Sequence, residues 1–184
     1  MAIGGAVMGT LAASDRRTLG AQTEDKTIVM KGETRIPGIV GDAGHVNVAS
    51  FNRKVLLSGE VKDEAMKAAV EREVMAIEGV QGVDNELEVM GTSSFTSRSN
   101  DSLITGKVKA SFVDSKELYA NSIKVITERG NVYLMGRVTQ REGLLAADAA
   151  SNVSGVSKVI KVFDYISDDE YKRLVSASGT QSKQ

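Results

Sequence analysis

A seven-residue pattern that occurs twice constrains the fold of this chain most strongly. Residues 55–61 and residues 132–138 both read V-x-L-x-G-x-V. The alternation of apolar positions predicts a half-buried strand, and the glycine predicts a bend at which the strand ends. The interval between Gly59 and Gly136 is 77 residues, and that between Gly79 and Gly155 is 76 residues. The agreement over this length indicates an internal duplication.

The sequence around each copy predicts the same order of elements. In the first unit we expect a helix over 23–36 that Thr23 caps, strands over 46–51 and 55–59, a helix over 62–77 and a strand over 83–89. In the second unit we expect a helix from Asn100 to Asp114, strands over 123–127 and 132–136, a helix over 139–153 and a strand over 159–163. Gly32 and Pro37 interrupt the first helix pattern, whereas Thr139 and Glu142 have the spacing of a capping box.

These elements predict an α+β fold of two tandem αββαβ domains, each a small mixed three-stranded sheet packed on two helices. We expect a flexible Gly/Ala-rich leader over 1–22, the domains over 23–90 and 100–166, a Ser/Thr-rich linker over 91–99, and a C-terminal tail over 167–184 that is disordered from Ser176. Aromatic residues make up only 4 % of the chain, so the cores are built mainly from aliphatic side chains.

The residues that carry chemistry do not point to an enzyme. Net charge is −1, which gives no overall field for nucleic acid, and the absence of cysteine excludes thiolate metal sites. His45 is the only histidine, and we interpret it as structural. The carboxylates at 168–170 fall in the predicted tail, where they are solvated rather than catalytic. We therefore expect no catalytic residues, no cofactor and no metal.

The strand hairpin ending in V-x-L-x-G-x-V, followed by a helix and a G-V-x-x-V turn, resembles the BON domain. Two such units after an Asp15-Arg16-Arg17 segment resemble the dual-BON-domain outer-membrane lipoproteins of the DolP type. Asn100-Asp101-Ser102 and the stretch 132–142 are the closest matches. The resemblance covers about residues 15–166, and it extends to soluble periplasmic stress proteins of the OsmY type.

The resemblance implies a periplasmic protein, lipid-anchored to the outer membrane, that supports envelope integrity at the division site. Because the family's anchor is a lipobox cysteine, we expect the leader to follow an anchor missing from this sequence. The implied ligand is anionic phospholipid such as phosphatidylglycerol in the inner leaflet of the outer membrane, and the implied protein partner is the outer-membrane protein assembly machinery. The family's lipid contacts correspond here to Leu103, Lys107, Lys109, Ser111 and Val113.

The predicted helix over 100–114 has a physical case of its own. Ile104, Val108 and Phe112 form its core stripe, which leaves Leu103 beside Lys107 on another face. Close relatives have tryptophan at the position of Leu103; leucine inserts into a membrane but anchors less specifically at its interface. The alternative interpretation is an ordinary solvated face. The chain would then be a soluble or anchored chaperone-like module that assists outer-membrane protein assembly or the envelope stress response.

Overall fold

The computed structural model describes residues 15–179, and the side chains of residues 15–176. The predicted leader and tail therefore lie partly outside the described residues. Contacts divide the chain into two compact units, which we describe separately. One is Leu19–Asn100, and the other joins the segment ending at Thr18 to the chain from Asp101 onward.

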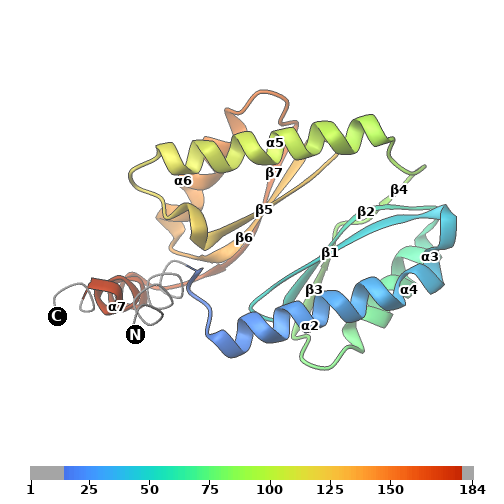
Figure 1. Cartoon of the computed structure of the whole chain (residues 1–184), viewed down its shortest axis with the longest axis horizontal. Coiled ribbons are helices and arrows are strands. Elements are labelled where there is room, and N and C mark those ends of the chain that lie inside the picture. Colours follow the sequence, from blue (N-terminus) through green and yellow to red (C-terminus); the bar gives the residue numbers. More distant parts are fainter. Residues whose placement is uncertain (1–14, 180–184) are drawn as a thin grey trace, which may run out of the picture. The chain divides into compact units, whose positions relative to one another are not determined.

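The first unit contains a sheet in the order β1-β2-β3, with β4 also pairing with β2 (Figure 1). Strand β2 is antiparallel to β1 and parallel to β3 and β4. Its elements are α2 (Leu19–Arg35), α3 (Pro37–Val40), the 3-10 turn η1 (Gly41–Ala43), β1 (His45–Phe51), β2 (Lys54–Val61), α4 (Glu64–Met75), β3 (Gly82–Asn85) and β4 (Glu88–Val89).

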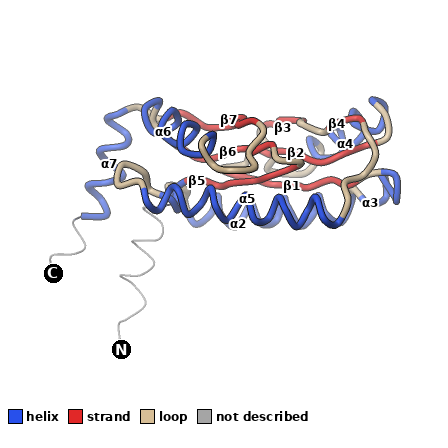
Figure 2. Tube along the Cα trace, turned by 90° about the horizontal axis from the view of Figure 1, so that it is seen from above, coloured by secondary structure: helices blue, strands red, loops and turns tan. Residues whose placement is uncertain are grey.

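The second unit repeats this topology with a three-stranded sheet in the order β5-β6-β7. Strand β6 is antiparallel to β5 and parallel to β7, so the predicted α+β class and mixed sheets are confirmed. Its elements are α5 (Phe95–Asp114), η2 (Ala120–Ser122), β5 (Ile123–Glu128), β6 (Asn131–Val138), α6 (Gln140–Ser151), β7 (Lys158–Tyr165) and α7 (Asp168–Gly179). Figure 2 distinguishes its helices from its strands.

Each sheet is covered on one face by two helices that share its hydrophobic core. In the first unit, Ile28 of α2 and Val70 of α4 pack with Leu57 of β2. In the second unit, Val108 of α5 and Ala146 of α6 pack with Leu134 of β6. The described part of the chain holds no helix that combines the length and the hydropathy needed to cross a bilayer.

The first helix of each unit begins earlier than the sequence predicts. Thr23 is not a cap, because α2 starts at Leu19 and the Thr23 hydroxyl donates to the Leu19 carbonyl oxygen (3.0 Å). Asn100 is not a cap either, because α5 starts at Phe95, inside the predicted linker. Gly32 does not break α2. A Cβ there would lie 3.2 Å from Cγ1 of Val48, so the glycine lets the helix approach β1 closely.

The repeated glycine does not end its strand, which corrects the predicted bend. Strands β2 and β6 continue through Gly59 and Gly136 to the following valines. A Cβ on Gly136 would lie 2.5 Å from the Ser122 carbonyl oxygen. The glycine therefore allows the backbone before β5 to come close, while the pairing of β6 with β7 continues to Val138.

The ends of the described chain also differ from the predictions. Arg16 is buried and α2 begins at Leu19, so residues 15–22 are not an extension of a flexible leader. At the other end, α7 reaches Gly179, although a disordered tail was expected from Ser176. The capping box, by contrast, is confirmed: Glu142 N donates to Thr139 Oγ1 (3.2 Å), and Thr139 N donates to Glu142 Oε1 (3.0 Å).

We predict that Gly136→Ala lowers the free energy of unfolding of the second unit by about 2 kcal/mol, because the new methyl group forces the strands apart. Urea denaturation monitored by circular dichroism measures the change. Gly106→Ala in α5 is the matched control, since no atom outside its own helix turn lies within 4 Å of the added Cβ. A Gly136→Ala protein as stable as the control variant would contradict the close-approach argument.

Candidate functional site on helix α5

Helix α5 is held to its sheet by the apolar stripe that the sequence predicts. Ile104, Val108 and Phe112 are buried in the second core. The Thr105 and Thr127 hydroxyl oxygens lie 2.7 Å apart and add a hydrogen bond between α5 and β5. One face of the helix therefore packs against the core, and the opposite face is exposed to solvent and accessible to a ligand.

A buried carboxylate fixes α5 to the β5–β6 hairpin. Asp101 accepts hydrogen bonds from the backbone N–H groups of Arg129 (2.8 Å) and Gly130 (2.9 Å). Asp25 has the same role in the first unit, where it accepts from the N–H groups of Asn52 and Arg53, both at 2.8 Å. Neither role is predicted from the sequence above. The signal was the recurrence of an aspartate at the interval that separates the two units.

The exposed face of α5 carries an apolar ridge, which we define as Leu103, Gly106, Ala110 and Val113. Leu103 is 65 % exposed and Val113 is 72 % exposed, and the two small residues between them are also exposed. With 3.6 residues per turn, the 3-4-3 spacing of these residues places them in one row along the helix. Leu103 and Val113 thus lie at the two ends of this row, about 15 Å apart at 1.5 Å per residue, with only small side chains between them.

Two lysines border the ridge on opposite sides. The same helical period places Lys107 on one side of the ridge and Lys109 on the other, and both are exposed. Neither forms an ion pair with any residue between 15 and 179. The two positive charges are therefore available to an anionic ligand that contacts the ridge.

The structure does not group Ser111 with the other predicted contact residues. Ser111 is half-buried, and its hydroxyl donates to the Val108 carbonyl oxygen at 2.7 Å. It lies toward the core side of α5, away from the apolar ridge. Gly106 and Ala110 are not among the predicted contact residues, although their helical spacing places them in one row with Leu103 and Val113.

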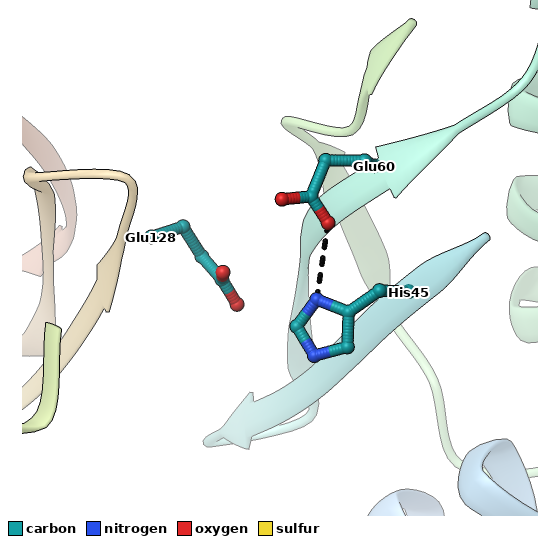
Figure 3. A group of neighbouring side chains, drawn as sticks. All are labelled: His45, Glu60 and Glu128. Atoms are coloured by element: carbon teal, nitrogen blue, oxygen red, sulfur yellow. Dashed lines mark hydrogen bonds and ion pairs between the residues drawn. The ribbon is translucent and has the colours of Figure 1, made fainter. Parts of the chain in front are cut away.

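The single histidine has a partner on the neighbouring strand of its own sheet. His45 and Glu60 are opposite each other in the β1–β2 register. Figure 3 shows the His45 ring turned toward the Glu60 carboxylate, with 3.1 Å between Nδ1 and Oε2. Glu60 is fully buried, so this hydrogen bond satisfies a polar group that would otherwise be costly to bury.

Comparison with known proteins identifies the two repeated units. The family model described as the BON domain matches residues 33–91 and again residues 100–167. The chain belongs to the BON-domain family. We therefore call Leu19–Asn100 BON domain 1, and we call the unit that begins at Asp101 BON domain 2.

Two relatives resemble this BON protein over most of its length. It is 42 % identical over 167 residues to a Haemophilus influenzae protein named Outer membrane lipoprotein DolP, covering 89 % of this chain and 86 % of that protein. It is 33 % identical over 158 residues to the 21 kDa hemolysin of Actinobacillus pleuropneumoniae, covering 83 % and 79 %. The resemblance to DolP-type proteins with two BON domains is thus confirmed. Among solved structures, Chlamydia trachomatis CdsD matches 78 % of this chain and 96 % of its own, with 12 % identity and a TM-score of 0.32, too low to support an argument.

We predict that Asp101→Ala destabilises BON domain 2, because the hairpin amides of Arg129 and Gly130 lose a buried acceptor. The expected loss is about 1–3 kcal/mol in the free energy of unfolding, measured by urea denaturation. Asp114→Ala, at the exposed end of the same helix, is the control and should change stability little. Equal stability of the two variants would show that Asp101 does not fix the helix to the hairpin.

Proposed function

We propose that this chain is a non-enzymatic, outer-membrane-associated protein whose BON domain 2 binds anionic phospholipid through helix α5. The observation that carries the proposal is the apolar ridge with a lysine on each side, on the face of α5 opposite the core. Acyl chains would contact Leu103 and Val113, while phosphate headgroups would contact Lys107 and Lys109. Gly106 and Ala110 would allow the helix backbone to lie close to the membrane surface.

The relatives support this cellular setting. The name of the Haemophilus influenzae relative includes outer membrane and lipoprotein, and that protein aligns with 89 % of this chain. We infer a location on the periplasmic side of the outer membrane, with a lipid anchor in the native form. Support of envelope integrity, action at the division site and contact with the protein assembly machinery belong to the same proposal.

The size of the surface predicts weak and reversible binding. Complete burial of a leucine or valine side chain contributes about 1.5–3 kcal/mol. Each lysine near an anionic leaflet contributes about 1 kcal/mol. Because only part of each apolar side chain can enter the bilayer, α5 alone would hold the protein loosely, and a separate lipid anchor would raise its local concentration at the membrane.

We predict that Leu103→Glu reduces binding to phosphatidylglycerol vesicles by at least about tenfold. The new carboxylate would lose its hydration on entering the membrane surface, and the negatively charged headgroups would repel it. Co-sedimentation with vesicles of phosphatidylglycerol and of phosphatidylcholine measures the change. Leu144→Glu in α6 is the matched control, since Leu144 is 62 % exposed in the same domain.

The vesicle experiment tests separately whether the protein binds lipid and whether it does so through α5. Absence of phosphatidylglycerol-dependent binding by the wild-type chain would reject the function and favour a module that acts on proteins. Equal loss of binding in the two leucine variants would reject α5 as the binding surface.

We also predict that replacing Lys107 and Lys109 together with serine weakens vesicle binding by about 25-fold, since each lost lysine corresponds to about fivefold. The decrease should shrink as salt is raised, because the electrostatic contribution is screened. Lys158→Ser, at an exposed position of β7, is the control. Unchanged binding and salt dependence in the double variant would exclude the lysines from headgroup recognition.

A further inference from the structure

Arg16 lies in a binding site formed by BON domain 2. Its side chain is only 1 % exposed and makes two parallel hydrogen bonds to Glu142, at 2.8 Å to Oε1 and 2.7 Å to Oε2. Its guanidinium also donates to the Arg137 carbonyl oxygen at 2.9 Å, and Arg137 donates back to the Arg16 carbonyl oxygen at 3.0 Å. The rings of Tyr119 and Tyr171 are 5.5 and 5.2 Å from the guanidinium. We call Tyr119, Arg137, Glu142 and Tyr171 the Arg16 site.

The chemistry of the Arg16 site selects a guanidinium. The Glu142 carboxylate is buried at the start of α6, where it accepts the capping hydrogen bond from Thr139 N and the Arg16 guanidinium balances its charge. A planar guanidinium binds both carboxylate oxygens and presents its faces to aromatic rings at the same time. A lysine ammonium is a point charge that cannot reproduce this geometry.

The backbone conformation of Arg16 is one that this residue type disfavours, which indicates that the site holds it in place. Arg16 has φ = 65°, in the left-handed region that non-glycine residues seldom adopt. Such a conformation persists when surrounding contacts determine it. Within the described part of the chain, the Arg16 site supplies such contacts to both the side chain and the backbone of Arg16.

Helix α7 contacts the same site through Tyr171 and Glu170. Residues 168–176 are all exposed or half-buried, so this part of α7 contributes no buried side chain to the core. Tyr171 reaches the Arg16 guanidinium and the Tyr119 ring, whose centroid is 6.4 Å away, and Glu170 pairs with Arg137. Burial against the domain raises the pKa of the Tyr171 hydroxyl above its ordinary value.

An open cavity of about 500 Å³ adjoins the Arg16 site and shares three of its residues, Tyr119, Glu142 and Tyr171. Asp168 and Lys172 of α7 also line it, together with Leu145 of α6. One wall of the cavity therefore exists only when α7 is docked. Release of α7 would expose the floor formed by α6.

We propose that the Arg16 site is an arginine-specific binding site for the chain's own N-terminal segment, and that α7 stays docked on BON domain 2 only while Arg16 fills it. The two ends of the described chain are then held or released together. The proposal is independent of lipid binding by α5, because no residue of the Arg16 site belongs to the apolar ridge.

Hydrogen–deuterium exchange of the full chain tests the proposal. In Arg16→Ala, amide exchange in α7 should rise at least about tenfold, while β5, β6 and β7 keep their protection, because only a local opening becomes easier. Arg16→Lys should show the same direction of change. Arg17→Ala is the matched control, since it removes a neighbouring arginine that pairs with Asp15.

Rescue in trans tests the specificity for arginine. A synthetic peptide of residues 12–20, added to the Arg16→Ala protein, should restore the protection of α7, whereas the same peptide with Arg16→Ala should not. Wild-type protection of α7 in the Arg16→Ala protein, or equal rescue by the two peptides, would overturn the proposal.

A second variant covers the case in which Arg16→Ala does not fold. Tyr171→Ala leaves the ion pair between Arg16 and Glu142 in place and removes only the ring from α7. We expect faster exchange in α7 and unchanged exchange in the sheet. Unchanged exchange in α7 would contradict the attachment of this helix through the Arg16 site.

Discussion

Each BON domain is built around a central strand that pairs along both edges. Strands β2 and β6 are antiparallel to the preceding strand and parallel to a later one. The hairpin turn and the helix that follows the central strand therefore each bring the chain back alongside it. The close approach at Gly136 lets β5 pair with β6 as far as Ile123, and the pairing with β7 runs on to Val138. The helices take their positions from the resulting sheet, and the outward face of α5 follows from the inward packing of Ile104, Val108 and Phe112.

The sequence predicted what depends on neighbouring residues and missed what depends on distant ones. Alternation identified both central strands, and the Thr139–Glu142 spacing identified a capping box, because these signals are local. Local signals did not predict where α2 starts, or that α2 continues through Gly32. A glycine fits at position 32 because Val48, on strand β1, packs closely against the helix there.

The same distinction applies to the functional site. Leu103 and Val113 were selected through the family resemblance, and helical geometry then adds Gly106 and Ala110 between them. Asp101 was harder to interpret, because its partners belong to a hairpin 28 and 29 residues later in the chain. The sequence of α5 alone thus predicts which of its residues are exposed. The position of the helix on the sheet depends on contacts with residues distant in the chain.

The ion pair between Arg16 and Glu142 has a consequence for how the protein forms. The two residues are separated by 126 positions, and all of BON domain 1 lies between them in the chain. A folded BON domain 1 is more compact than an unfolded segment of the same length, so its folding reduces the average separation that Arg16 and Glu142 must close. Since loop closure costs more entropy as the free loop grows, prior folding of BON domain 1 lowers the cost of completing BON domain 2.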